Sequence, residues 1–231
     1  MGEGLHIGII LDGNRRFAKK KKMAEWRGHS YGAKKVMRLL DWCAELKVRE
    51  LTLYSFSVEN FKRPEKEKAE IFKLFRRHMK RLEKEEKFRK NGIKIRFAGR
   101  IGMFPSDITE NMKRLMEKTK DNKGLVLNFA MGYGGRAEIV DAVRKICRMV
   151  KEGKIDVESV DEQTITSNLY IEDEPELIIR PGGEKRVSNF LIWQGYYSEW
   201  HFTDKLWPEF TKKDIKDAID DFNRRERRFG E

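Results

Sequence analysis

The sequence predicts an α/β protein: a three-layer sandwich with a mostly parallel central sheet of about six strands, flanked by helices. Short apolar runs alternate with amphipathic helical patterns along the whole chain. Polar and glycine-rich residues follow the apolar runs, as expected where buried parallel strands end. No linker, repeat or low-complexity tract interrupts the pattern. We therefore expect residues 1–231 to form a single domain with helices on both faces of the sheet.

Strands are expected where apolar and β-branched residues run together between turn signals. The first run ends at Asp12-Gly13, and a later run ends at the turn that follows Arg180. The predicted strands are residues 5–11, 51–56, 93–98, 125–130, 176–180 and 197–202.

Helices are expected where apolar residues recur every three or four positions, as Val36, Leu39, Leu40 and Cys43 do. A helix-forming segment also follows Asn14, and Ser106 is placed to cap a helix. The other predicted helices are residues 31–47, 66–90, 106–120, 136–151, 161–169, 189–195 and 211–228. The apolar stripe of the 66–90 helix comprises Ile71, Leu74, Phe75, Met79 and Leu82.

The chain carries a net charge of +12. Such a field attracts nucleic acid, anionic lipid surfaces or phosphorylated small molecules. The basic runs at 19–22 and 224–228 lack the interleaved aromatic residues that a single-strand nucleic-acid binder needs. Cys43 and Cys147 lie far apart in apolar helical patterns and are expected to be buried, reduced thiols. No apolar run approaches a membrane span, which predicts a cytoplasmic protein with at most peripheral contact at the inner face of the membrane.

The stretch 5–19 is a candidate anion site. Asp12 follows a predicted strand, and ligands of open α/β sheets bind beyond the carboxyl ends of strands. Arg15, Arg16 and the free N–H groups of a starting helix are suited to receive an anion there. Taken by itself, the stretch fits a metal-assisted phosphate site and a plain Asp-Gly turn equally well.

Other predicted strands are also followed by polar clusters. Ser57, Glu59, Asn60 and Arg63 follow the second strand, and a Tyr-Gly-Gly-Arg turn follows the fourth. Arg180, Arg186 and Ser188 surround the Gly-Gly turn after the fifth. Arginine binds phosphate well because its planar fork matches two oxygens. Nucleotide-binding glycine motifs, zinc-type Cys/His spacing and the Asp-Asp-x-x-Asp pattern of trans-type prenyl synthases are absent from the sequence.

Five blocks together resemble the cis-prenyltransferase family, which includes undecaprenyl and dehydrodolichyl diphosphate synthases. They extend over almost the whole chain in the family's order. The blocks are HIGIILDGNRRFAK (6–19), LTLYSFSVENFKRP (51–64), LNFAMGYGGRAEIV (127–140), RPGGEKRVSNFL (180–191), and YSE (197–199) with FTDKLWP (202–208). The resemblance implies a transferase with a hydrophobic tunnel that uses Mg²⁺ to join isopentenyl diphosphate, with Z geometry, to an allylic diphosphate primer. Its product would be a polyprenyl diphosphate for lipid glycosyl carrier synthesis.

The resemblance also implies residue roles. Asp12 would be the metal-linked catalytic aspartate, with Glu199 as a second Mg²⁺ ligand. The allylic diphosphate would be held by Gly13, Asn14, Arg16 and His29, beside a mobile loop with Phe56, Ser57, Glu59, Asn60 and Arg63. Arg15 and Phe17 would also belong to the substrate-binding residues. Isopentenyl diphosphate would be held by Arg180, Arg186 and Ser188, and the C-terminal R-x-G motif, Arg228 and Gly230, would reach the site of a homodimeric partner. No dedicated base is evident, and a substrate diphosphate oxygen and Asn60 both remain open as the proton acceptor.

Several positions depart from the bacterial pattern. Bacterial members usually have Gly where this chain has Arg15, often have Trp where it has Phe17, and have Arg where it has Glu25. Whether Arg27 takes the role of that absent Arg stays open. The Arg-Arg pair at 15–16, together with the charged stretch 83–87 in a lengthened helix, resembles archaeal and eukaryotic members. A non-catalytic subunit of a heteromeric enzyme is the alternative, although such subunits lose motifs that this chain keeps. Product length and the choice between farnesyl and geranylgeranyl primers stay open, as does homodimer against heteromer.

Overall fold

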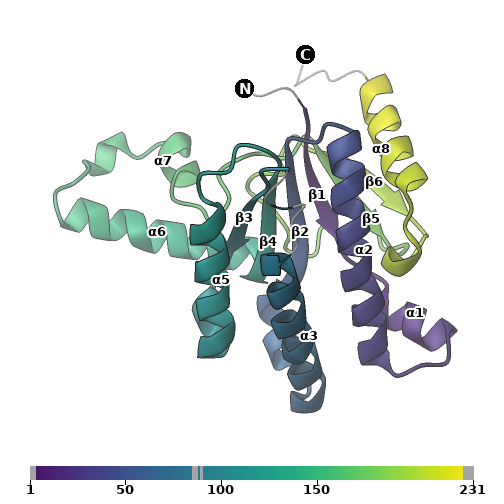
Figure 1. Ribbon diagram of the computed structural model, residues 1–231. Helices are drawn as coiled ribbons and strands as arrows, with labels where there is room; N and C mark the ends of the chain where they lie inside the picture. Colours follow the sequence, from purple (N-terminus) through teal and green to yellow (C-terminus); the bar gives the residue numbers. More distant parts are fainter. Residues whose placement is uncertain (1–3, 85–87, 89–90, 226–231) are drawn as a thin grey trace.

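A computed structural model describes residues 4–84, 88 and 91–225, and contains one sheet of six parallel strands (Figure 1). The spatial order is β3-β4-β2-β1-β5-β6. The strands are β1 (His6–Ile10), β2 (Glu50–Ser57), β3 (Lys94–Ala98), β4 (Val126–Tyr133), β5 (Leu177–Pro181) and β6 (Glu199–Thr203). All six predicted strands are confirmed. The strand order reverses between β1 and β5, and such a switch point opens a crevice at the carboxyl edge of the sheet.

Helices enclose the sheet as the sequence predicts, with different ends. The main ones are α1 (Asn14–Lys20), α2 (Glu25–Glu45), α3 (Glu65–Lys84), α5 (Ser106–Thr119), α6 (Gly135–Lys151), α7 (Glu162–Thr166) and α8 (Lys212–Arg224). Helix α2 begins six residues before the prediction. Its first six residues contain no buried apolar side chain, because Gly28 is the buried residue among them, so no apolar stripe marks them. Short 3₁₀ helices, Val58–Lys62 (η1) and Trp207–Glu209 (η4), were not predicted.

The predicted helix at 189–195 is wrong: the segment forms consecutive turns. Ser188, Asn189 and Leu191 have φ values of 48°, 61° and 44°, which a right-handed helix does not allow. Phe190 and Leu191 are nevertheless completely buried against the sheet. Their apolar spacing therefore reflects packing of a turn, which sequence periodicity does not distinguish from a short helix.

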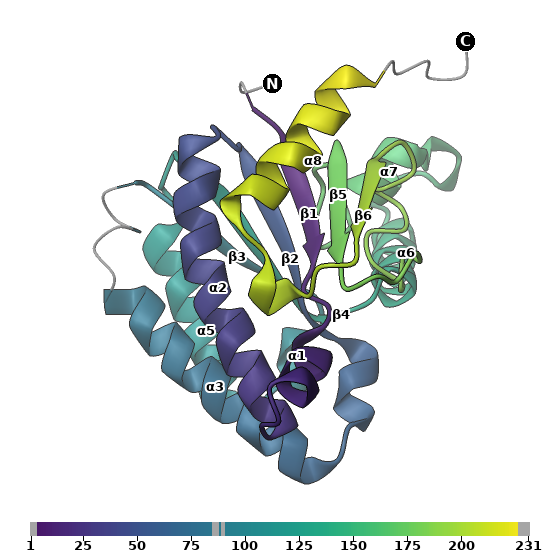
Figure 2. The same ribbon diagram turned by 90° about the vertical axis from the view of Figure 1, so that its right-hand side faces the viewer.

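The sheet is covered on both faces, which confirms the three-layer prediction. Figure 2 shows α2, α3 and α5 on one side of the sheet, and α6 and α7 on the other. The larger core lies under α2, α3, α5 and α8 and includes Cys43. Cys147 on α6 is exposed, so the prediction that both thiols are buried is wrong for it. A smaller core on the opposite face packs Tyr133, Ile171, Phe190 and Leu191 against the strands. Within the described residues, no helix is long and apolar enough to cross a membrane.

Candidate active site at the carboxyl edge of the sheet

Asp12 lies at the switch point, directly after β1. Its Oδ2 accepts a hydrogen bond from Arg180 Nη2 at 3.0 Å, across from the end of β5. Its Oδ1 accepts from the Gly13 N–H at 2.6 Å and from Arg16 Nη2 at 3.2 Å. Gly13 has φ 95°, a conformation that favours glycine and turns the chain directly into α1. The loops after β1 and β5 thus meet at Asp12, whose carboxylate lies between the guanidinium groups of Arg16 and Arg180.

Arg180 is a buried cation, with 3% of its surface exposed. It donates from Nη1 to Ser188 Oγ at 2.7 Å and to the Arg186 carbonyl oxygen, while its Nε has no hydrogen-bond partner. A buried charge is costly unless it is paired. Asp12 compensates part of this cost, and the free Nε leaves Arg180 able to bind a further anion.

Asn14 is clamped between α1 and α2. Its Nδ2 donates to the Leu11 carbonyl at 2.9 Å, and its buried Oδ1 has no partner. Gly28 and Gly32 lie one turn apart on α2 where it crosses α1. A Cβ on Gly28 would lie 2.0 Å from the Asn14 carbonyl oxygen, and one on Gly32 would lie 2.2 Å from Asn14 Oδ1. The two glycines therefore let α2 approach the site closely enough to position its next side chains.

The η1 loop forms the rim of the site. Asn60 Oδ1 accepts from the Ser57 N–H at 3.1 Å as part of a reciprocal cap. Glu59 accepts from Asn189 Nδ2 at 3.2 Å, which links this loop to the one after β5. Burial alone would raise the pKa of the Glu59 carboxyl. Hydrogen bonds from its own backbone N–H, Ser57 and Asn189 outweigh burial, so the pKa is lower than its ordinary value.

His29 faces a charged pair on the rim. Its Nε2 lies 3.4 Å from Arg63 Nη1 and 3.8 Å from Glu67 Oε1, and Arg63 pairs with Glu67 at 2.7 Å. Burial and then the Arg63 charge lower the pKa of His29 to about 4. The imidazole is therefore neutral at pH 7, and positive charge at this position comes from Arg63. Glu67 was missed by the sequence reasoning, although its i,i+4 spacing from Arg63 signalled the pair.

A cavity of about 620 Å³ extends from this rim into the core between the sheet, α2 and α3. One end is polar and the other is apolar. The polar lining includes Asp12, Asn14, His29, Ser57, Glu59, Asn60, Arg63, Arg180, Ser188 and Asn189. The apolar lining includes Val36, Met37, Phe56, Ile71, Leu74, Phe75, Met79, Leu82, Phe97, Phe129, Met131 and Trp207. All five residues of the stripe predicted for α3 thus line the cavity, together with His78, which was not predicted.

Several predicted site residues have other partners in the structure. Arg15 pairs with Glu25 at 2.5 Å, so the two departures from the bacterial pattern compensate each other in charge. Arg16 also binds the Gly182 carbonyl at 2.5 Å, and Arg186 is exposed and pairs with Glu184 at 2.6 Å. Phe17 is buried against Tyr31, 5.3 Å between ring centroids, and Arg27 lies over the Trp26 ring. The positions of Arg228 and Gly230 lie outside the described residues.

Glu199 does not lie with Asp12 in the same chain. It is in register with Leu177, which is in register with Ile7, near the amino edge of the sheet. Asp12 comes five residues after Ile7, so the two carboxylates are separated by about 16 Å along the strand direction. Glu199 instead pairs with Arg225 at 2.6 Å. One chain therefore does not bring both predicted metal ligands together.

The side chains around Asp12 suit a metal cation that binds together with an anionic ligand. Among the described residues, no group of three metal-ligating side chains is present, and Asp12 is the carboxylate at the centre of the site. Mg²⁺ is commonly held by one or two carboxylates together with phosphate oxygens and water. Asp12 fits that type of site, because its partners Arg16 and Arg180 are themselves suited to phosphate.

The fold and the site define a parallel α/β protein with a cavity that has a polar, cationic mouth and an apolar interior. Residues 10–230 match the family model described as "Putative undecaprenyl diphosphate synthase". The chain belongs to this family and is a cis-type prenyl diphosphate synthase, a transferase.

Individual relatives agree. The chain is 44% identical over 227 residues to the tritrans,polycis-undecaprenyl-diphosphate synthase (geranylgeranyl-diphosphate specific) of Methanopyrus kandleri, covering 97% of this chain and 84% of the relative. It is also 44% identical to the synthase of the same name from Thermococcus kodakarensis, covering 97% and 86%.

Solved structures share the fold over their whole length. Lavandulyl diphosphate synthase from Lavandula x intermedia, in complex with dimethylallyl diphosphate, superimposes with a TM-score of 0.94 at 31% identity, covering 98% of both chains. A probable undecaprenyl diphosphate synthase from Campylobacter jejuni gives a TM-score of 0.82 at 35% identity, covering 100% of both chains.

Proposed function

We propose that this protein condenses isopentenyl diphosphate units, in a Mg²⁺-dependent reaction, onto an allylic diphosphate primer to give a Z-polyprenyl diphosphate for lipid glycosyl carrier synthesis. The observation that carries the proposal is the division of the cavity into a polar rim and an apolar interior. A primer or product has the same division, with a diphosphate at one end and a hydrocarbon chain at the other.

The residues of the rim divide between two diphosphates. Asn14, His29 and Arg63 face the mouth of the cavity beside α2 and η1, and we assign them to the allylic diphosphate. Arg180, Ser188 and Arg186 surround the turn after β5, and we assign them to isopentenyl diphosphate. Asp12 lies between the two groups. Mg²⁺, when bound with a diphosphate, would supply positive charge that offsets the negative charge brought together there.

The reaction begins when the allylic C–O bond breaks and diphosphate leaves. The rim cations stabilise the negative charge that develops on this leaving group. The isopentenyl double bond then attacks the allylic carbocation through its terminal carbon, C4, which leaves a positive charge on C3. Loss of a proton from C2 of the isopentenyl unit forms the new C2=C3 double bond. Asn60 Oδ1 is already engaged by the Ser57 N–H, and an amide is a weak base. A diphosphate oxygen of the substrates is therefore the favoured proton acceptor.

Incorporation of radiolabelled isopentenyl diphosphate tests the proposal. Purified protein is incubated with farnesyl or geranylgeranyl diphosphate, with Mg²⁺ or with excess chelator, and products are resolved by chromatography. We expect Mg²⁺-dependent elongation with geranylgeranyl diphosphate preferred, because the archaeal relatives are named for that primer. Absence of incorporation with every primer would defeat the proposal, and chromatography would also give the product length.

A homodimer would complete the site. Val140, Val143 and Ile192 are large apolar side chains left exposed on and beside α6, and a second copy is the partner expected to cover them. Because Glu199 and Asp12 are separated within one chain, we propose that Glu199 and the tail motif act in the site of the partner. The homodimer is favoured over a heteromer with a non-catalytic subunit, because Asp12 and Arg180 are both retained.

Subunit complementation distinguishes these arrangements. Asp12→Ala and Glu199→Ala homodimers should each be inactive, and exchanging their subunits should restore activity, because a mixed dimer contains one site with both carboxylates. No recovery, with subunit exchange verified by light scattering and tagged copies, would place both residues in one chain. Deleting residues 227–231 should lower turnover far more than thermal stability, and equal turnover in the truncated protein would contradict the proposed role of the tail.

A further inference from the structure

The outer surfaces of α2 and α3 carry two matching rows of cations. The α2 stripe is Arg27, Tyr31, Lys34 and Arg38, and the α3 stripe is Lys73, Arg77, Lys80 and Lys84. Both follow the spacing of four, three and four residues that keeps side chains on one helix face. All eight residues are exposed. Seven cations and one tyrosine thus occupy two helix faces.

The two stripes lie against each other. Helix α2 packs on α3, and the two helices are neighbours in both Figure 1 and Figure 2. The pKa of His78 on α3 is consistent with this proximity. Burial is the largest cause that lowers it, and the charges of Arg81 and Arg77 on α3 and of Lys34 on α2 lower it further. Cations from both helices therefore surround one imidazole. The two stripes therefore come together near His78, and together they are called the basic surface.

This basic surface lies directly outside the apolar part of the cavity. The inner face of α2 contributes Val36 and Met37 to the cavity lining, and the inner face of α3 contributes Leu74, His78 and Leu82. Two helices therefore separate the chain-holding end of the cavity from the stripes.

The stripes differ from an ordinary solvated helix face. On α8, Lys213 pairs with Asp217 at 2.5 Å and Lys216 with Asp220 at 2.6 Å, so positive and negative charges alternate. On the α3 stripe, Lys73 pairs with Glu70, but no described carboxylate lies within ion-pair distance of Arg77, Lys80 or Lys84. Like charges on neighbouring helix positions repel one another. This repulsion is relieved when an anionic surface covers them.

We propose that the α2 and α3 stripes dock the protein on an anionic membrane surface. Clusters of lysine and arginine are attracted to anionic lipid headgroups, and tyrosine is favoured at the membrane–water interface. The choice of lipid rather than nucleic acid rests on the proposed function, because the cavity behind the stripes would hold a polyprenyl chain that ultimately enters a membrane.

Vesicle sedimentation tests the docking surface. Wild-type protein should sediment with vesicles of phosphatidylcholine and phosphatidylglycerol, remain in solution with phosphatidylcholine alone, and be released by added salt. The variant Arg38→Gln, Arg77→Gln, Lys80→Gln should lose about tenfold or more of its partitioning. The control variant, Lys113→Gln, Lys118→Gln, Lys151→Gln, removes the same charge from exposed positions on α5 and α6 and should partition within about twofold of wild type.

The proposal is overturned if wild-type protein does not bind anionic vesicles. It is also overturned if both variants lose vesicle binding equally, because the loss of net charge would then explain the effect. It is also overturned if the stripe variant loses affinity for duplex RNA while its vesicle binding is unchanged. Incorporation of isopentenyl diphosphate in vesicle-free solution is measured in parallel. Normal incorporation without vesicle binding would refute the docking surface and leave the proposed function intact, whereas vesicle binding without incorporation would refute the proposed function.

Discussion

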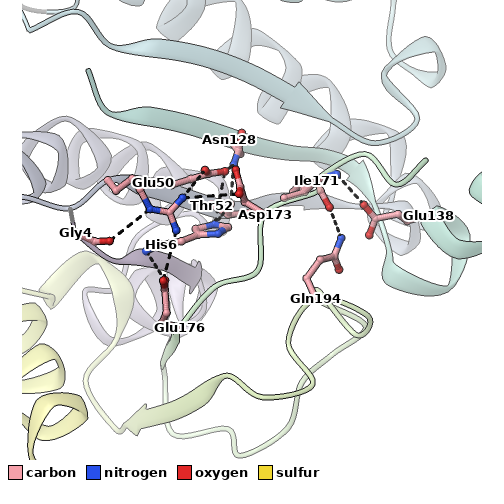
Figure 3. A network of polar contacts seen from close by, with 11 residues as sticks. Gly4, His6, Glu50, Thr52, Asn128, Glu138, Ile171, Asp173, Glu176 and Gln194 are labelled. Carbon is pink, nitrogen blue, oxygen red and sulfur yellow. Dashed lines mark hydrogen bonds and ion pairs between the residues drawn. The ribbon is translucent and has the colours of Figure 1, made fainter. Parts of the chain in front are cut away.

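The two edges of the sheet both concentrate polar side chains but use them differently. At the amino edge, His6, Glu50 and Asn128 are almost completely buried in a closed network (Figure 3). Asn128 Nδ2 donates to Glu50 Oε1 at 2.6 Å and to Thr52 Oγ1 at 2.9 Å, and His6 Nε2 lies 2.7 Å from the same hydroxyl. This network ties β1, β2 and β4 together without opening on the cavity.

At the carboxyl edge, Asp12, Asn14 and Arg180 line the cavity, and Asn14 Oδ1 and Arg180 Nε have no partner. Buried polar atoms without partners are costly. His6 Nδ1 in the amino-edge network also has no partner, but His6 does not line the cavity, whereas Asn14 and Arg180 do, so a ligand can reach them. The comparison indicates that access to a cavity, rather than burial or perturbed pKa, distinguishes the functional edge from the structural one.

Asp12→Ala should have the largest effect, on activity. Removing the carboxylate deprives the site of the proposed Mg²⁺ ligand and of the partner that positions Arg180. We expect incorporation to fall by about 10³-fold, and the melting temperature to fall measurably while the protein remains folded, because buried Arg180 loses the carboxylate that compensates its charge. A melting curve and a turnover assay on the same preparation check this. A large loss of stability with proportionate loss of activity would assign Asp12 a structural role instead.

Gly28→Ala should affect both stability and activity. The new Cβ would lie 2.0 Å from the Asn14 carbonyl oxygen, which forces α1 and α2 apart. Overpacking of this kind costs about 1–3 kcal/mol of unfolding free energy, and the displaced rim should raise the KM for the allylic primer. Gly102→Ala is the matched control, because its Cβ would meet no atom within 4 Å. Equal behaviour of the two variants would contradict the close contact at Asn14.

Glu50→Gln should change the pH dependence of stability while leaving activity intact. Burial, and then a hydrogen bond with Asp173, raise the pKa of Glu50 to about 7 from an ordinary value of 4.5. The folded protein therefore keeps a proton that the unfolded chain releases between these pH values. The stabilising contribution is present below pH 4.5 and is lost as the pH rises through 7.

Denaturant unfolding at several pH values checks this prediction. The wild-type curve contains this loss between pH 4.5 and 7, and the glutamine variant should lack it, since its amide does not titrate. An unchanged pH profile would mean that Glu50 is not protonated in the folded state. Turnover at pH 7 is expected to stay at the wild-type level, because the amino-edge network does not line the cavity.

Glu25→Gln should have the smallest effect. Arg15 and Glu25 are both more than half exposed, and such surface pairs contribute about 0–1 kcal/mol. The melting temperature should therefore barely change. The KM for the allylic primer should fall slightly if the released Arg15 reaches the diphosphate, as its position in the first block implies. A higher KM would show that Glu25 positions α1 for substrate binding.

Much of the site was predictable because it follows local rules. Apolar runs that end in turn residues mark buried parallel strands, and the residues just after them must gather at one edge. Asp12, Asn60, Arg180 and Ser188 were all placed in this way. The first residues of α2, by contrast, were not predicted as helix because they lack an apolar stripe. The turns at 189–195 were predicted as a helix because their apolar residues follow helical spacing.

The sequence by itself determined the six strands, the carboxyl-edge location of the site and the family. Tertiary structure decided which charges face one another. Arg15 pairs with Glu25, Arg186 turns to Glu184, and Glu199 lies at the opposite edge from Asp12. The reason is physical: strand and helix patterns depend on neighbours in the chain, whereas an ion pair depends on the distance between side chains from separate elements. Only packing sets that distance, and packing also hollows the cavity between sheet, α2 and α3.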